Sequence, residues 1–179
     1  MNADPESQSL LAQILLLVVL TLINAFLAAS EIAVVSVNRN RLEQKANEGD
    51  VKAKKLLKII AEPTNFLSTI QVGITLVNIL SGASLADNLA NRLAPLLGGG
   101  AAAKNIASVI VLAILTFVSI VFGELYPKRI AMNKSEEVAD LTSGTIRLLG
   151  IVAKPFVWLL SASTSLLANL TPTDFDDED

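Results

Sequence analysis

The sequence predicts an all-α membrane protein with three transmembrane helices and further juxtamembrane helices, and two observations carry this prediction. The 179 residues are 52% hydrophobic and only 17% charged, whereas soluble domains carry about 25% charged residues. The apolar residues also gather in runs close to the ~20 residues that a helix needs to cross a bilayer. No alternating pattern typical of strands competes with these runs.

The first predicted span covers residues 10–37. The residues before it include Asp4 and Glu6 but no lysine or arginine. A signal peptide begins with basic residues, so we expect a retained membrane segment. A polar, lysine-rich stretch, residues 38–62, favours helix and separates this span from the second one, residues 66–93.

The third predicted span covers residues 106–126 and follows a glycine-rich loop at residues 98–100. Pro127 comes directly after this span. Because a proline interrupts the hydrogen bonding of a helix, we expect the third span to end there.

Residues 141–170 are apolar again, but Pro155 divides them. Each piece is short for a full crossing, so we interpret the two pieces as interfacial or re-entrant helices. Residues 1–170 are therefore predicted to form one membrane domain, and residues 171–179 an acidic tail.

The basic residues predict the orientation of the chain. Residues 38–62 hold seven of the 14 lysines and arginines and residues 128–154 hold five more, whereas the segment before the first span holds none. Lysine and arginine accumulate in cytoplasmic loops. We therefore expect a multi-pass plasma-membrane protein with an external N-terminus and, provided that the last segment does not cross, a cytoplasmic C-terminus.

The composition excludes several kinds of functional site. The chain has no cysteine and no histidine, so it lacks thiolate ligands and the commonest general base and transition-metal ligand. A bound metal is therefore expected to be a hard ion held by oxygen, and an enzymatic function is not expected. The net charge of −3 gives no electrostatic reason to expect nucleic acid as a partner.

The second span carries polar residues on one helical stripe. Gln71, Thr75 and Asn78 follow one another at spacings of four and three residues, which place them on the same face. Within a bilayer such residues either line an ion pathway or hydrogen-bond neighbouring helices. We favour the first interpretation for Asn78, and both stay open for Gln71 and Thr75.

The end of the third span combines a carboxylate with an unpaired backbone carbonyl. Pro127 has no amide hydrogen, so the carbonyl of Gly123 loses its helical partner. Glu124 adjoins it in the sequence, and together these oxygens fit a cation site. The alternative is an ordinary proline-terminated helix in which Glu124 pairs with Lys128, four residues later.

The first span brings Ser30 and Glu31 to membrane depth as well. A hydroxyl and a carboxylate in a bilayer both require partners. We interpret Ser30 as an ion ligand. Glu31 either lies along the ion pathway or forms a structural ion pair with an arginine near the cytoplasmic end or with Lys128.

Three motifs contain these residues in order along the chain. They are Leu22-Ile23-Asn24-Ala25-Phe26 leading into Ala29-Ser30-Glu31-Ile32-Ala33, then Gln71-Val72-Gly73-Ile74-Thr75-Leu76-Val77-Asn78, and finally Phe122-Gly123-Glu124-Leu125-Tyr126-Pro127-Lys128. Together they resemble the transmembrane domain of the cyclin M/CorC family, also called HlyC/CorC, and the resemblance covers nearly the whole chain.

The resemblance implies a homodimer and Mg²⁺ transport, in several members as export coupled to Na⁺ influx, which makes Na⁺ a candidate coupling ion. It also implies that the Mg²⁺ site uses Ser30, Asn78, the backbone of Gly123 and the carboxylate of Glu124. The alternative function is a non-transporting dimeric membrane anchor, or Mg²⁺ sensor, for cytoplasmic regulatory domains.

Two departures from the family pattern affect these expectations. Ala28 stands where many relatives carry a small hydroxyl residue, which puts the coupling ion in doubt. Family members also usually continue into cytoplasmic CBS domains that bind adenine nucleotide, and this chain stops at Asp179. We therefore expect nucleotide binding only in cytoplasmic domains that are absent from this chain.

Overall fold

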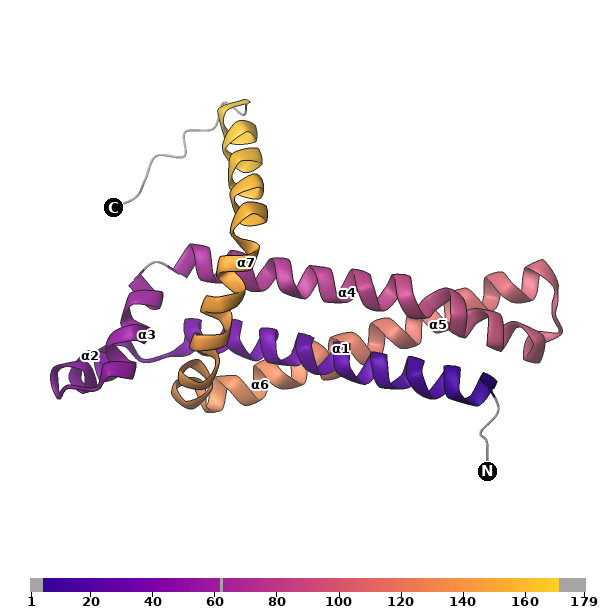
Figure 1. The fold of residues 1–179 in the computed structure, drawn as a ribbon, viewed down its shortest axis with the longest axis horizontal. Coiled ribbons are helices and arrows are strands. Elements are labelled where there is room, and N and C mark those ends of the chain that lie inside the picture. The colour runs from indigo at the N-terminus through magenta and orange to yellow at the C-terminus, as the bar shows by residue number, and fades with distance from the viewer. Residues whose placement is uncertain (1–4, 62, 171–179) are drawn as a thin grey trace.

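The computed structural model describes residues 5–61 and 63–170, and within them the chain is helical apart from short turns (Figure 1). The predicted acidic tail, residues 171–179, lies outside the described residues. The elements are α1 (Pro5–Ser36), α2 (Arg39–Asn47), α3 (Val51–Ala61), α4 (Pro63–Leu93), the 3₁₀ turn η1 (Ala94–Leu97), α5 (Gly100–Ile120), the π-helical turn η2 (Val121–Leu125), α6 (Tyr126–Asn133) and α7 (Ser135–Leu170). The described residues contain no strand, so the all-α prediction is confirmed.

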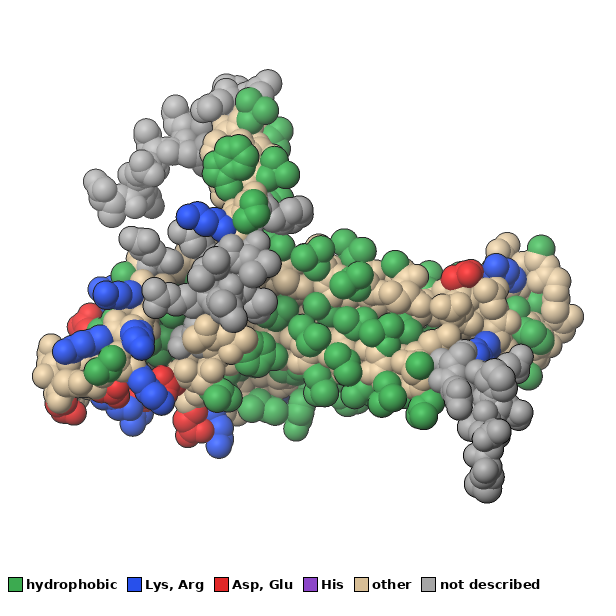
Figure 2. All heavy atoms as spheres, viewed as in Figure 1, with side chains coloured by type: hydrophobic (Ala, Val, Ile, Leu, Met, Phe, Trp, Pro, Cys, Tyr) green, Lys and Arg blue, Asp and Glu red, His purple; other side chains and the backbone are tan. Residues whose placement is uncertain are grey.

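Among residues 5–61 and 63–170, three helical stretches are long and apolar enough to cross a membrane: Leu10–Ser36, Phe66–Leu97 and Gly100–Asn133. Only 11% of the most apolar part of the first stretch is buried inside the protein, so most of its leucines, isoleucines and valines face outward. Figure 2 shows the result, a largely apolar surface along the helices with charged side chains gathered toward the ends. This surface fits the hydrocarbon of a bilayer, and it confirms a multi-pass membrane protein.

The helix of the third predicted span does not end at Pro127 as expected, because the helical stretch continues to Asn133. The turn η2 explains the difference. The amide of Tyr126 donates to the carbonyl of Val121, five residues earlier, which is the hydrogen bond of a π-helix. Pro127 is then the second residue of α6, a position where the missing amide hydrogen is tolerated.

The turn between α4 and α5 is built by glycine. Gly98, Gly99 and Gly100 have φ angles of 97°, 72° and 84°, which residues with a Cβ rarely adopt. The chain therefore reverses within a few residues, and α5 packs back along α4. A small apolar cluster that includes Leu85 of α4 and Leu115 of α5 fills the space between these two helices.

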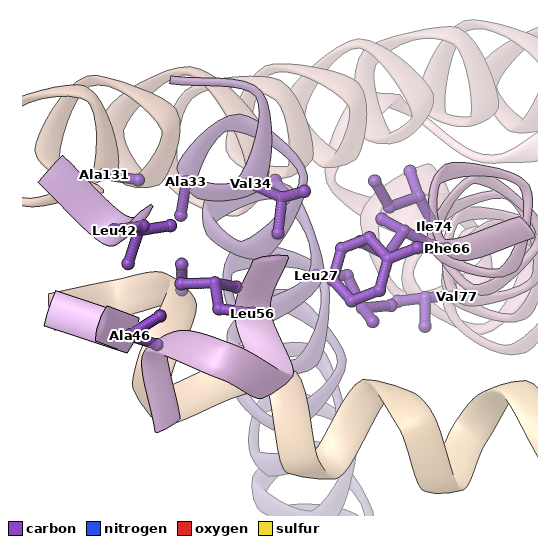
Figure 3. Packing of buried hydrophobic residues seen from close by; sticks show 14 of the residues in the cluster. Leu27, Ala33, Val34, Leu42, Ala46, Leu56, Phe66, Ile74, Val77 and Ala131 are labelled. Atoms are coloured by element: carbon purple, nitrogen blue, oxygen red, sulfur yellow. The ribbon is translucent and has the colours of Figure 1, made fainter. Parts of the chain in front are cut away.

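A larger apolar core joins α1 to α2, α3, α4, α6 and α7 (Figure 3). Leu27 of α1 packs on the α4 side, where the Cβ that Gly73 lacks would be only 2.9 Å from Leu27 Cδ1. Small residues also bring α1 close to its neighbours, since Ala28 and Ala33 of α1 and Ala131 of α6 are each 0% exposed. The resulting close packing places the polar side chains of α1 within reach of α4 and η2.

The hairpin formed by α2 and α3 is fastened to the start of α7 by ion pairs. Glu136 of α7 pairs with Lys45 and with Arg41, the latter at 3.5 Å. Lys52 Nζ lies 2.9 Å from Asp140 Oδ2, and the hydrogen bond and charge of Asp140 raise the pKa of Lys52 above its usual 10.5. These charges lie beyond the apolar spans, at one end of the molecule (Figure 2).

The two pieces expected on either side of Pro155 form a single helix, α7, with the proline inside it. A proline removes one hydrogen bond from a helix but does not by itself separate its two halves. The first part of α7 packs on α1 and α4, and its second part runs out from the bundle, crosswise to α4 (Figure 1). An interfacial or re-entrant position for residues 141–170 stays a prediction.

Candidate cation site

Polar side chains from three helices meet at Asn78. Asn24 of α1 donates from Nδ2 to Asn78 Oδ1 at 3.4 Å, and the hydroxyl of Ser119 of α5 donates to the same oxygen at 2.8 Å. Asn24 is 1% exposed, whereas Asn78 lies toward the exposed face of α4. We call Asn24, Asn78 and Ser119 the amide cluster, and it links α1, α4 and α5.

Gly123 of η2 lies directly against the amide cluster. It is buried, and a Cβ added to it would be 2.9 Å from Asn24 Nδ2. Real Cβ atoms do not approach other heavy atoms so closely, so a side chain at residue 123 would have to displace the carboxamide of Asn24. The backbone of η2 therefore packs against the buried carboxamide of Asn24.

Two oxygen atoms in this region lack a hydrogen-bond donor of the usual kind. Pro127 has no amide hydrogen, so the Gly123 carbonyl has no α-helical donor. Asn24 Oδ1 is buried and has no hydrogen-bond partner among the described residues. An unpaired buried acceptor such as Asn24 Oδ1 is costly, and more so in a bilayer. Both oxygens are of the kind that coordinates a cation, since carbonyl oxygens are common ligands of hard metal ions.

A second cluster joins two carboxylates through one ammonium group. Lys128 Nζ of α6 lies 2.9 Å from Glu124 Oε1 of η2 and 3.0 Å from Glu31 Oε2 of α1. We call these three residues the ion-pair cluster. Both pairing alternatives that the sequence left open, one for Glu124 and one for Glu31, are therefore present together and share the same lysine.

The two clusters are neighbours along the bundle. Asn24 and Glu31 are seven residues apart on α1, which is about two helical turns or ~10 Å. On the opposite side Gly123, which lies against the amide cluster, and Glu124 of the ion-pair cluster are consecutive residues of η2. Carboxamide, hydroxyl, carbonyl and carboxylate oxygens thus follow one another between α1, α4 and the α5–η2–α6 stretch.

The remaining predicted site residues make contacts within their own helices. Ser30 is 0% exposed and donates to the carbonyl of Phe26 at 2.6 Å. Thr75 donates to the carbonyl of Gln71 at 2.9 Å, and both side chains lie on the exposed face of α4. The described contacts therefore bring together Asn78 and Gly123, through Asn24, but do not join Ser30, Gln71 or Thr75 to either cluster.

Asn24 and Ser119 were not predicted as site residues. Both are polar residues in apolar runs, which is the signal that identified Asn78. Ser119 also precedes Gly123 by four residues and so shares its helical face. Their direct contact with Asn78 is a long-range relationship that the spacing within each span does not contain.

The donor set restricts the cation that this region can hold. The described residues contain no group of three or more Asp, Glu, His or Cys side chains placed to bind one metal ion. A cation here would rely on the two carboxylates, on neutral oxygens and on retained water. Mg²⁺ binds oxygen ligands and usually keeps several waters, so the chemistry of these residues fits this ion.

The fold and the two polar clusters together define a multi-pass helical membrane domain. Oxygen atoms that are suited to coordinating a cation lie between its spanning helices. The chain belongs to the family described as the cyclin M transmembrane N-terminal domain, whose family model matches residues 15–178. The resemblance of the three sequence motifs is thereby confirmed.

Curated relatives agree with this membership. The chain is 39% identical over 170 residues to a UPF0053 protein of Synechocystis sp., 36% over 148 residues to the UPF0053 inner membrane protein YfjD of Escherichia coli, and 31% over 160 residues to the polyamine export protein of Haemophilus influenzae. These matches cover 92%, 83% and 88% of the chain but only 38%, 32% and 37% of the relatives. The chain therefore spans about a third of the length of these proteins.

Proposed function

We propose that this domain carries Mg²⁺ across the plasma membrane, with Mg²⁺ bound between the transmembrane helices and export coupled to Na⁺ influx. The observation that supports this most directly is the meeting of three spans at Asn78, next to a Gly123 carbonyl that has no α-helical donor. Membership of the cyclin M family supports it independently.

In this proposal Asn78, the Gly123 carbonyl and the Glu124 carboxylate are the ligands, and Ser30 joins them when its hydroxyl turns away from the Phe26 carbonyl. Glu31, Lys128, Gln71 and Thr75 lie along the ion pathway. The π-helical turn interrupts the third span near the ligands, as broken helices do at the ion sites of many secondary transporters. A homodimer with external N-termini is part of the same proposal.

Ion flux in liposomes tests the proposal. Purified protein in vesicles loaded with a Mg²⁺-sensitive dye should move Mg²⁺, and an opposing Na⁺ gradient should accelerate the movement. Vesicles with the Glu124→Ala protein are the matched control and should show no Mg²⁺ flux. Mg²⁺ binding without flux would instead favour the membrane anchor or sensor, and equal flux with both proteins would refute the site.

Polyamine export is a second candidate, because one relative is named for it and the ion-pair cluster offers a specific reason. Lys128 Nζ lies about 3 Å from both Glu31 and Glu124, so these carboxylates are placed to hold an alkylammonium group. The same vesicles assayed with radiolabelled spermidine distinguish the two cargoes. Spermidine flux without Mg²⁺ flux would replace our first proposal.

A further inference from the structure

The ammonium group of Lys128 lies where two carboxylates from different helices converge. It is 3.0 Å from Glu31 Oε2 of α1 and 2.9 Å from Glu124 Oε1 of η2. The three side chains are 24%, 26% and 34% exposed, so the cluster is largely shielded from the surroundings. The ammonium group of this one lysine side chain thus connects α1 and η2.

The two carboxylates of this cluster need a cation close to them. Glu31 and Glu124 together carry two negative charges, and at membrane depth uncompensated charges are costly. With the positive charge of Lys128 included, the net charge of the cluster is −1. A divalent cation that ligates Glu124 brings two positive charges close to the ammonium group, and like charges at such distances repel strongly in a medium of low dielectric constant.

From this geometry we infer that Lys128 sets the affinity of the site by acting as a tethered competitor of the transported cation. The inference rests on the proposed function. In the empty site Lys128 holds Glu31 and Glu124 together, and when Mg²⁺ binds, the ammonium leaves Glu124. The return of the ammonium then assists release, so that the cation does not stay bound to the carboxylate.

This displacement also changes a contact between helices. Lys128 belongs to α6 and Glu31 to α1, and these two helices pack against each other. An ammonium that leaves Glu124 keeps Glu31 as its nearest carboxylate. Lys128 therefore reports the occupancy of the site, because its environment differs between the empty and the loaded protein.

Amine labelling of the parent protein tests the displacement without any substitution. Protein in detergent is treated with a lysine-reactive reagent with and without saturating Mg²⁺, and modification at Lys128 is measured by peptide mass spectrometry. Lys104 is the matched control, since it pairs with Asp87 at 3.4 Å at the other end of the spans.

We expect Mg²⁺ to increase labelling of Lys128 and to leave labelling of Lys104 unchanged. Unchanged labelling of Lys128 in protein that binds Mg²⁺ would overturn the inference but not the proposed function.

Two variants test the effect on affinity. Lys128→Gln removes the competing charge, so isothermal titration should give a Mg²⁺ affinity about tenfold higher, which is ~1.4 kcal/mol. Its flux should show a lower KM together with a lower maximal rate. Lys128→Arg keeps the competing charge and should therefore bind Mg²⁺ more weakly than Lys128→Gln. Affinity in Lys128→Gln that is equal to or below the parent's would refute the competitor role, and a parent without Mg²⁺ binding would overturn both this inference and the proposed function.

Discussion

The carboxamide of Asn24 and the backbone of Gly123 are in such close contact that a methyl group on residue 123 would be 2.9 Å from Asn24 Nδ2. Asn24 in turn donates to Asn78. The path of η2 past α1 thus determines where the carboxamide of Asn78 is held. The following predictions derive from this contact and from its neighbours.

Gly123→Ala should destabilise the protein and impair Mg²⁺ flux, because the new methyl group displaces Asn24. Overpacking of this kind costs about 1–3 kcal/mol, which thermal unfolding in detergent measures. Gly82→Ala is the control, since nothing lies within 4 Å of a Cβ at this position. That protein should be as stable as the parent or slightly more stable. A Gly123→Ala protein with parental stability and flux would show that the close contact is unimportant.

Ser119→Ala should weaken Mg²⁺ binding about fivefold, because one hydrogen bond of ~1 kcal/mol that orients Asn78 is lost. Ser108 lies on the same helix but donates to the Lys104 carbonyl of its own helix. Ser108→Ala should therefore bind Mg²⁺ like the parent. Isothermal titration compares the two, and equal affinities would mean that Ser119 does not position the ligand.

Pro127→Ala should lower Mg²⁺ flux while leaving the protein folded. Alanine supplies an amide hydrogen that can pair with the Gly123 carbonyl, which removes this oxygen from the cation site. Circular dichroism checks the helix content and the liposome assay checks the flux. Pro95→Ala, in the turn η1, is the control and should transport normally. Parental flux in Pro127→Ala would show that the Gly123 carbonyl is not a ligand.

The spans were predictable from the sequence because the membrane imposes a length and an apolar composition on every crossing helix. Asn78 and Glu124 were selected as candidate ligands because polar groups are rare at membrane depth, and Gly123 because Pro127 lacks the amide hydrogen that its carbonyl would accept in an α-helix. The end of the third span was not predictable in this way. Pro127 alone indicates a helix end, and only the π-helical hydrogen bond from Tyr126 to Val121 allows the helix to continue.

The partners of each polar residue were also beyond the sequence. Glu124 and Lys128 have the spacing of a helical ion pair, and this pair is present. The contact of the same lysine with Glu31 depends on how α1 packs on α6, which small residues such as Ala28 and Ala131 determine. Periodicity reveals the face on which a residue lies, but the facing helix decides its partner.

The ion pair between Lys52 and Asp140 predicts a pH-dependent contribution to stability. The pKa of Lys52 is raised in the folded protein, so the pair stabilises the fold fully below the usual pKa of 10.5, and this contribution is lost as the pH rises through the raised value. Lys52→Met should therefore lower the unfolding temperature at pH 8, and the difference from the parent should vanish at the most alkaline pH. Lys55→Met, at an exposed residue of the same helix, is the control. A difference that is constant with pH would contradict this assignment.

The most direct measurement of the site is isothermal titration of Mg²⁺ into the purified protein, compared with Asn78→Ala and Glu124→Gln. If these oxygens hold the transported ion, the parent binds Mg²⁺ with a saturable heat and each variant binds it at least about tenfold more weakly, a loss of ~1.4 kcal/mol. Equal Mg²⁺ affinities in all three proteins would contradict the assignment of the cation site to these residues.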